Sequence, residues 1–276
     1  MEKFTVAVAQ MRTVSNKQVN YEKAEALIAE AAQKGAQLVL LPEDMHYIGP
    51  YSPDNREDIP GGECCQRLSA AAKKHNIWVH AGTIKEISPD PYKAYNTALL
   101  FSPQGELVST YRKMHLCDIV GGPGVTVRES DKKLAGDQLV TVQTELGCIG
   151  MATCYDIRFP EMLRLLAVKG AQILCIPACF LNITGSAHWE VLLRAAAIHN
   201  SCYILASDQC GTREDGTVNW GHAMIIDPWG TVIAQAGQEK EGLIFAEIDL
   251  AYTDELKARL GSFHNRRTDI YSLTER

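Results

Sequence analysis

The stretch Gly147–Glu161, with the sequence GCIGMATCYDIRFPE, combines an apolar run, one cysteine and the start of a helix. The apolar run ends at Cys154, a charged and aromatic cluster follows, and Pro160 with Glu161 opens a helical pattern. A nucleophile at the end of a buried strand, just before a helix, is commonly presented to a pocket. Most buried cysteines, however, are inert small apolar residues. A catalytic role for Cys154 therefore requires partners elsewhere in the chain.

The length and composition indicate an ordinary soluble globular protein. The chain has 276 residues, of which 46% are hydrophobic and 22% charged. This length is enough to bury a substantial core, and no low-complexity linker divides it, so we expect one domain over residues 1–276. The net charge of −6 offers no basic face for nucleic acid.

The sequence also predicts a cytoplasmic protein without a membrane span. No stretch approaches the roughly 20 apolar residues that cross a bilayer, and residues 1–10 lack the pattern of a signal peptide. The nine cysteines are scattered and odd in number, which argues against a disulfide framework.

We expect neither a metal ion nor a cofactor. The close cysteine pairs, Cys64 with Cys65 and Cys175 with Cys179, lack the C-x-x-C spacing typical of zinc sites. There is no G-x-x-x-x-G-K-[ST] or G-x-G-x-x-G phosphate loop. The glycine-rich Gly121–Gly124 does not precede a helical pattern and is interpreted as a turn.

Strand and helix patterns follow one another along the chain. The predicted strands are Phe4–Ala9, Gln37–Leu41, Ile77–Ile84, Tyr95–Phe101, Glu106–Tyr111, Leu139–Gln143, Cys148–Thr153, Gln172–Ile176, Tyr203–Ser207, Ala223–Ile226, Val232–Gln235 and Ile244–Ile248. The predicted helices are Lys17–Lys34, Glu63–His75, Pro160–Lys169, Ala187–His199 and Tyr252–Leu260. Ser15 and Gln18 form a predicted capping box for the first helix. Tyr47–Gly62 is a long loop rich in Pro, Gly and Asp, of which Tyr47–Pro60 is a candidate lid, and Gly121–Gly136 is irregular.

Two segments of the chain recur in the same order. KGAQLVLLPE (Lys34–Glu43) returns as KGAQILCIPA (Lys169–Ala178), and TALLFSPQGELVSTY (Thr97–Tyr111) is echoed by HAMIIDPWGTVIAQA (His222–Ala236). The shared order favours two similar halves, each with its own sheet. Two mixed sheets packed face to face, with helices outside, would bury all of the apolar strands. The predicted fold is therefore an α/β sandwich of two facing sheets.

Two charged residues follow predicted strands and are possible partners for Cys154. Glu43 comes directly after the buried strand Gln37–Leu41, where burial would raise its pKa and make it a useful base near neutral pH. The alternative is a turn or helix-capping glutamate. Lys113 follows the strand Glu106–Tyr111, where a lysine is usually only solvated. Neither residue alone decides between these interpretations.

Taken together, Glu43, Lys113 and Cys154 fit a Cys–Glu–Lys hydrolase. The thiolate would attack a carbonyl carbon while Glu43 moves the protons. The Lys113 ammonium would stabilise the thiolate and the developing oxyanion, and the backbone N–H of Tyr155 is a natural second oxyanion donor. Pairing with His115, His188 or His222 is the competing mechanism, but none of these histidines has a sequence context that predicts it.

Three of these stretches resemble the marker sequences of a known family. VLLPED, YRKMHL and GMATCYDIRFPE are similar to those of the nitrilase (carbon–nitrogen hydrolase) superfamily, and the resemblance spans nearly the whole chain. CYDIRFPE, ITGSAHWEVLLRAAAIHN and WGHAMIIDPWG most resemble its Nit branch, which contains omega-amidases and deaminated-glutathione amidases.

The resemblance implies a four-layer αββα sandwich that forms a homodimer through helices on the active-site side. It implies Glu43 as general base, Lys113 as oxyanion stabiliser and Cys154 as nucleophile. A further family glutamate falls on Glu129, where it would orient Lys113 and the substrate amide. The alternative for Glu129 is a solvated loop acid.

Arg158, four positions after the nucleophile, is the predicted substrate-binding residue. Its guanidinium suits bidentate binding of a carboxylate, and the resemblance points to amides of 2-oxo acids. The alternative is an ion pair with Asp156, Glu161 or a partner subunit. Phe180 and Thr184 follow the strand Gln172–Ile176, where pocket walls are expected.

The predicted function is that of a cofactor-free amidase with a thioester intermediate. The substrate is 2-oxoglutaramate or 2-oxosuccinamate, as for an omega-amidase, or deaminated glutathione with its larger leaving group. Other carbon–nitrogen substrates, a nitrile or an N-carbamoyl compound, are an alternative. A non-catalytic scaffold of the same fold is another, although the complete Glu–Lys–Cys set argues against it.

Overall fold

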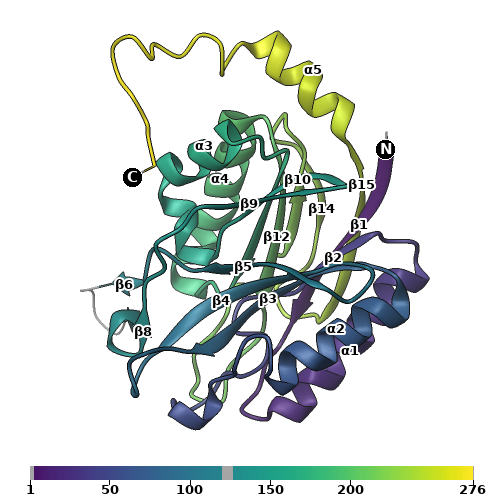
Figure 1. The fold of residues 1–276 in the computed structure, drawn as a ribbon, viewed down its shortest axis with the longest axis vertical. Helices are drawn as coiled ribbons and strands as arrows, with labels where there is room; N and C mark the ends of the chain where they lie inside the picture. The colour runs from purple at the N-terminus through teal and green to yellow at the C-terminus, as the bar shows by residue number, and fades with distance from the viewer. Residues whose placement is uncertain (1–2, 120–126, 276) are drawn as a thin grey trace.

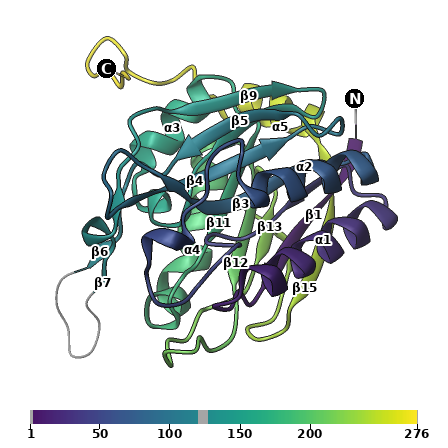
Figure 2. The same ribbon diagram turned by 60° about the horizontal axis from the view of Figure 1, so that its bottom comes forward.

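The computed structural model describes residues 3–119 and 127–275, and its strands form two facing sheets (Figures 1 and 2). The strand order of the first sheet is β15–β1–β2–β3–β4–β5, and that of the second is β9–β10–β11–β12–β13–β14. The strands of the first sheet are β1 (Lys3–Met11), β2 (Leu38–Leu40), β3 (Trp78–Ile87), β4 (Ala94–Phe101), β5 (Leu107–Arg112) and β15 (Gly242–Asp249). Those of the second are β9 (Val140–Thr144), β10 (Gly147–Met151), β11 (Ile173–Ala178), β12 (Tyr203–Gln209), β13 (Met224–Ile226) and β14 (Val232–Gln235).

Helices cover the outer face of each sheet, on opposite sides of the molecule in Figure 1. The first sheet carries α1 (Lys17–Gln33) and α2 (Glu63–His75), and the second carries α3 (Pro160–Val168) and α4 (Asn182–Asn200). A fifth helix, α5 (Leu250–Leu260), follows β15. The predicted four-layer αββα sandwich is therefore confirmed. Within the described residues, no helix is long and apolar enough to cross a membrane.

Alternation along the strands assigns their side chains to different layers. In β1, Val6 and Val8 belong to a core cluster with residues of both sheets and of α3 and α4, whereas Ala7 and Ala9 pack with the residues under α1 and α2. Because successive side chains of a strand point to opposite faces, a strand covered on both sides is apolar throughout. This is why the sequence shows continuous apolar runs.

A short contact joins the two sheets into one hydrogen-bonded unit of thirteen strands. Gln10 and Met11 of β1 pair in parallel with Asp208 and Gln209 of β12. Beyond this seam the sheets fold over each other, so that β3 lies against β11 and β5 against β9. The sequence did not predict the seam.

The two predicted halves are present and correspond strand by strand. Both sheets have an antiparallel edge strand, three parallel strands and an antiparallel hairpin, in the same order. The repeated segments Lys34–Glu43 and Lys169–Ala178 contain β2 and β11, respectively. At the end of these segments the Glu43 backbone N–H donates to the carbonyl of Ala178, its counterpart, at 3.3 Å. The repeat therefore brings the ends of β2 and β11 together at the centre of the molecule.

Several local predictions need correction. The N-cap of α1 is Asn16, whose side chain accepts from the Val19 N–H at 3.3 Å, so the capping box of Ser15 and Gln18 is wrong. Helix α4 begins at Asn182, five residues before the predicted Ala187. The predicted turn at 121–124 lies outside the described residues.

The short elements of the irregular regions were not predicted. They are the strands β6 (Asp118–Ile119), β7 (Val127–Arg128) and β8 (Lys133–Leu134), and the 3-10 helices η1 (Pro53–Asn55), η2 (Glu129–Asp131) and η3 (Cys154–Arg158). β6 pairs with β7, and β8 adds to the edge of β4. Two of the 3-10 helices, η2 and η3, hold predicted site residues.

Candidate active site

Cys154 is the first residue of η3 and follows the end of β10. It is buried and has a φ of +46°, a left-handed conformation that costs about 1–3 kcal/mol in a residue other than glycine. The Thr153 N–H donates to Asp156 Oδ2 at 2.8 Å, which closes the turn around the cysteine. The Cys154 sulfur accepts a hydrogen bond from the backbone N–H of Cys179, at the end of β11. These contacts hold the thiol between the ends of two neighbouring parallel strands.

Asp156 fixes this turn to the segment that carries Lys113. Its Oδ2 also accepts from the Tyr111 hydroxyl at 2.7 Å, and its Oδ1 accepts from the His115 backbone N–H at 3.1 Å and lies 2.7 Å from His115 Nδ1. Asp156 is fully buried, so each of these bonds compensates for its desolvation. The pairing with His115 also means that Asp156 does not pair with Arg158.

Lys113 lies between two carboxylates. Its Nζ is 2.9 Å from Glu43 Oε1 and 2.9 Å from Glu129 Oε2, and all three side chains are largely buried. Asn96 donates to both acids, at 2.8 Å to Glu43 and 3.2 Å to Glu129. The Cys117 N–H donates to Glu129 Oε2 at 2.7 Å. The structure therefore brings Glu43, Lys113 and Glu129 together in one hydrogen-bonded group.

The charges of this group set its protonation states. Burial disfavours the charge of Lys113, but Glu129 and Glu43 outweigh it and raise the pKa of the ammonium well above its ordinary value. Burial also opposes ionisation of Glu129, yet Lys113 and Lys133 lower the pKa of this carboxyl to about 2. Burial and the Glu43 charge raise the pKa of the Cys154 thiol, against the opposing effect of Lys113. The thiol form of Cys154 is therefore favoured, and it lies beside the charged Lys113 and the side chain of Glu43.

These residues open into a cavity of about 400 Å³. Glu43, Lys113, Glu129 and Cys154 all line it. The predicted lid loop contributes three further residues to the wall, namely Ile48, Gly49 and Tyr51. Six cationic and four anionic side chains line the cavity, although the whole chain is acidic. The six cations are Lys85, Lys113, Arg128, Lys132, Lys133 and Arg213.

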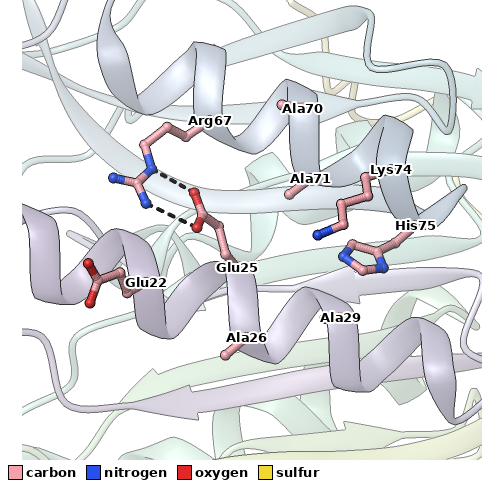
Figure 3. Close-up of a pocket in the computed structure, with 9 residues that line it drawn as sticks. All are labelled: Glu22, Glu25, Ala26, Ala29, Arg67, Ala70, Ala71, Lys74 and His75. Atoms are coloured by element: carbon pink, nitrogen blue, oxygen red, sulfur yellow. Dashed lines mark hydrogen bonds and ion pairs between the residues drawn. The ribbon is translucent and has the colours of Figure 1, made fainter.

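A larger hollow of about 550 Å³ lies elsewhere, between α1 and α2 (Figure 3). Four alanines and five charged or polar residues line it, and Arg67 makes a bidentate ion pair with Glu25, at 2.6 and 3.0 Å, in its upper part. No cysteine, serine or threonine lines it. The size of a cavity therefore does not identify the reactive site of this protein; the nucleophile and its charged neighbours do.

The predicted substrate-binding residues do not line the cavity around Cys154. The Arg158 guanidinium lies over the rings of Tyr155 and Phe180, at 5.5 and 5.3 Å, and Nη1 is 3.2 Å from His188 Nδ1. Phe180 packs on Trp189 in the core, and the Thr184 hydroxyl turns back to the Leu181 carbonyl at 3.4 Å. Cys179 and Leu181, on either side of Phe180, line the cavity instead. A role in substrate binding for Arg158, Phe180 and Thr184 stays a prediction.

The histidines of the competing mechanism have other partners. His115 is held by Asp156 and stacks on Phe159 with 3.7 Å between ring centroids, His188 meets Arg158, and His222 Nδ1 lies 2.9 Å from the Trp220 carbonyl oxygen. Among the residues that the structure describes, no histidine lines the Cys154 cavity. Among residues 3–119 and 127–275, no group of three His, Cys, Asp or Glu side chains is arranged to hold a metal ion.

Sequence reasoning missed Asn96, Asp156 and Arg213. Asn96 lies near the start of a predicted strand, and Arg213 lies in a loop outside every quoted motif, seven residues before WGHAMIIDPWG. Asp156 was visible two residues after Cys154, but only the fold brings Tyr111 and His115 to it. A buried polar residue inside an apolar strand, such as Asn96, was the one signal available.

Comparison with known proteins gives a consistent result. The family model described as carbon-nitrogen hydrolase matches residues 5–258. The chain is 41% identical to human deaminated glutathione amidase, in an alignment that covers 96% of this chain and 83% of the human protein. It is also 41% identical to omega-amidase NIT2 of Xenopus tropicalis, in an alignment that covers 100% of this chain and 99% of the frog protein. The solved structure of the Caenorhabditis elegans NitFhit protein superimposes with a TM-score of 0.92 at 35% identity, covering 99% of this chain and 67% of that one. The chain therefore belongs to the carbon-nitrogen hydrolase family, whose enzymes hydrolyse carbon–nitrogen bonds.

Proposed function

We propose that the protein is a cysteine-dependent amidase that hydrolyses a small carboxylate-bearing amide through a thioester. The observation that carries this proposal is the position of Lys113 between Glu43 and Glu129, in the wall of the cavity that holds Cys154. A buried ammonium held by two acids is a preorganised electrostatic stabiliser, which is the largest single contribution in many acyl-transfer enzymes.

In the proposed mechanism Glu43 takes the thiol proton as Cys154 attacks the amide carbon. The general base is needed because the pKa of the thiol is raised. Lys113 and the backbone N–H of Tyr155 stabilise the oxyanion. The Tyr155 N–H is suited to this role because the first backbone N–H groups of a helix such as η3 have no hydrogen-bond partner within the helix. Glu43 then protonates the leaving nitrogen, and ammonia or an amine departs as the thioester forms. Glu43 next removes a proton from water as the water oxygen attacks the thioester carbon. The C–S bond then breaks, the acid is released, and Glu43 returns the proton to the Cys154 sulfur, which restores the thiol.

An excess of positive charge supports a substrate with a carboxylate. Six cationic side chains against four anionic ones give the cavity the opposite charge to the chain as a whole. Charge of one sign in a cleft raises the local concentration of an oppositely charged substrate. The substrates we propose are 2-oxo acid amides, either 2-oxoglutaramate and 2-oxosuccinamate or deaminated glutathione. The names of the omega-amidase and deaminated glutathione amidase relatives support this class.

Ammonia or amine release from these substrates, measured as kcat/KM, tests the proposal. We expect turnover of at least one of them, and the ratio of the two values decides whether the leaving group is ammonia or a larger amine. Cys154→Ala should abolish turnover and the acyl-enzyme mass while the protein stays folded. Cys148→Ala, in the strand β10 that precedes Cys154 but away from the cavity, is the matched control. Full amidase activity in Cys154→Ala would contradict the mechanism.

The alternative functions give distinct results in the same assay. A nitrile or N-carbamoyl hydrolase would release acid from those substrates in preference to amides. A non-catalytic scaffold would form no acyl-enzyme with any of them. The intact Glu43, Lys113 and Cys154 group favours the enzyme.

We also propose that the protein forms a homodimer through α4. This helix starts next to Leu181 of the cavity wall and exposes the apolar side chains of Ile183, Val191 and Ile198. Exposed apolar side chains on one helix face are typical of protein–protein contacts. A cytoplasmic location stays a prediction that rests on the scattered, unpaired cysteines.

A further inference from the structure

Arg213 belongs to the cavity wall but to none of the sequence motifs. It lies in the loop between β12 and β13, whose backbone is fixed by the Arg213 N–H bond to Thr217 at 2.8 Å and by a β-bridge between Thr212 and Val218. The side chain is also held: Nε donates to Asn219 Oδ1 at 2.9 Å, and Nη2 lies 2.8 Å from Cys179 Sγ. The guanidinium is therefore positioned by protein contacts before any substrate arrives.

The partners of Arg213 are neutral, unlike those of the other enclosed cations in the cavity. Lys85 pairs with Asp44, Lys113 with Glu43 and Glu129, and Lys133 with Asp44 and Glu129. Within the described part of the chain, no carboxylate lies within 4.0 Å of the Arg213 guanidinium.

Lys132 and Arg128 also lack such a carboxylate partner, but they are exposed to water, whereas Arg213 is half-buried. The charges of Asp44, Asp215 and Glu43 act on the Arg213 guanidinium from a distance, but none of these carboxylates contacts it. A bound carboxylate would form the direct ion pair, with two parallel hydrogen bonds, that this partly desolvated guanidinium lacks. Arg213 is therefore the cavity cation that a bound anion would stabilise most.

Arg213 is also close to the reacting sulfur. Cys179 connects the two, because its backbone N–H donates to the Cys154 sulfur and its own sulfur contacts the Arg213 guanidinium. If the substrate amide lies over Cys154, a second group that a short carbon chain joins to the amide can therefore reach Arg213. Arg158, the residue predicted from sequence, does not line the cavity and has its guanidinium against two aromatic rings and His188.

We propose that Arg213 is the specificity residue that binds the free carboxylate of the substrate. This inference rests on the proposed amidase function and deepens it. Arg213 orients the amide over Cys154 by holding the far end of the molecule, so it contributes to binding and leaves the bond-breaking steps to Glu43, Lys113 and Cys154. The substrate class is thereby narrowed to short amides with a terminal carboxylate.

Kinetics with a matched pair of substrates test the inference. The pair is 2-oxoglutaramate and its carboxylate methyl ester, with ammonia release as the readout. In Arg213→Gln we expect kcat/KM for 2-oxoglutaramate to fall about 10- to 100-fold, mainly through KM, as for the loss of a charged hydrogen-bonding partner. The value for the ester should stay within about twofold. Arg213→Lys keeps the positive charge but loses the planar group that forms two parallel hydrogen bonds. Its kcat/KM for 2-oxoglutaramate should lie between the values of the wild type and Arg213→Gln.

Two further variants serve as controls. Arg259→Gln removes one positive charge from an exposed site on α5, outside the cavity, and should change kcat/KM only slightly for either substrate. Arg158→Gln tests the residue predicted from sequence. A carboxylate-specific loss in Arg158→Gln, with Arg213→Gln unaffected, would overturn the inference. An equal loss on both substrates in Arg213→Gln would do the same, because it would mean that Arg213 only supports the loop.

Binding of 2-oxoglutarate, the product acid, separates failure of the inference from failure of the proposed function. Titration calorimetry should show binding to the wild-type protein and at least about tenfold weaker binding to Arg213→Gln. If the wild type hydrolyses no amide but binds 2-oxoglutarate through Arg213, the function is wrong and the inference stands. If Arg213→Gln binds 2-oxoglutarate as well as the wild type, or the wild type does not bind it, the inference is wrong.

Discussion

At the scale of single residues, the charge of Lys113 depends on its two acids. Desolvation alone would favour the neutral amine, as it does for buried lysines in general. Glu129 is the largest opposing influence and Glu43 the next, and together they raise the pKa of Lys113 well above its ordinary value. Since that folded-state pKa lies above the unfolded one, the stabilisation is present at neutral pH and is lost only as the pH rises through the folded value.

Glu129→Gln should therefore weaken catalysis and change its pH dependence. Loss of this carboxylate lowers the pKa of Lys113, so that the ammonium is lost at a lower pH than in the wild type. We expect kcat to fall about 10²–10³-fold at neutral pH, as for the loss of a preorganised electrostatic group. The alkaline limb of the pH–rate profile should move to lower pH, which a profile of kcat/KM measures directly.

Asp131→Asn is the matched control, because Asp131 is an exposed acid of the same 3-10 helix. It should leave both the rate and the alkaline limb unchanged. A Glu129→Gln variant with lower activity but the wild-type pH profile would show that Glu129 does not act through Lys113.

The site residues that could be predicted from the sequence are those that directly follow a predicted strand. Glu43, Lys113 and Cys154 each follow the end of a strand, and a charged or nucleophilic residue there is visible as an interruption of an apolar run. Arg158 was chosen for its proximity to Cys154 along the chain. Arg213, 59 positions away, reaches the cavity only because β11 and β12 are neighbours, which no local pattern encodes.

At the scale of elements, Asp156 joins η3 to the segment after β5. It accepts hydrogen bonds from Tyr111, Thr153 and the His115 backbone, so it holds the Lys113 segment against the Cys154 turn. Cys154 keeps its left-handed backbone only while its surroundings require that conformation. The junction therefore connects stability with the position of the nucleophile.

We expect Asp156→Asn to reduce both stability and activity. The amide group would direct an N–H toward donors, leaving a buried donor without a partner, which should cost about 2–4 kcal/mol in the free energy of unfolding. Urea denaturation measures that cost, and kcat should fall as the Cys154 turn loosens. Glu161→Gln, at an exposed acid of α3, should change neither quantity. A fully stable and active Asp156→Asn would mean that the junction is not needed.

The early start of α4 shows why some element boundaries were missed. Its first turn contains Ile183, Thr184 and Gly185, which have lower intrinsic helix propensity than alanine. Packing against Trp220 determines where the helix starts. Only glycine fits at position 185, because a Cβ there would lie 2.2 Å from Cγ of Trp220. The glycine thus permits a contact between α4 and the loop before β13, and the contact favours the helix.

At the scale of the whole molecule, the site combines the two halves of the repeat. Glu43 and Lys113 follow strands of the first sheet, and Cys154 follows a strand of the second. The paired sheets were predictable because both repeated segments were visible in the sequence. The seam of Gln10 and Met11 with β12 was not, because it depends on how the two sheets are placed against each other.

The exposed apolar side chains of α4 predict that two copies of the protein assemble through this helix. Val191 is 66% exposed at the middle of this helix, on the same side as Ile183 and Ile198. In a dimer that buries this face, Val191→Glu would place an unpaired charge in the interface, which is strongly unfavourable. We therefore expect sedimentation to give a dimer for the wild type at micromolar concentration and a monomer for Val191→Glu. Val19→Glu is the control, since Val19 is an exposed valine of α1, in the opposite helix layer, and its change should leave the dimer intact. A wild-type monomer, or a Val191→Glu dimer as stable as the wild type, would contradict assembly through this helix.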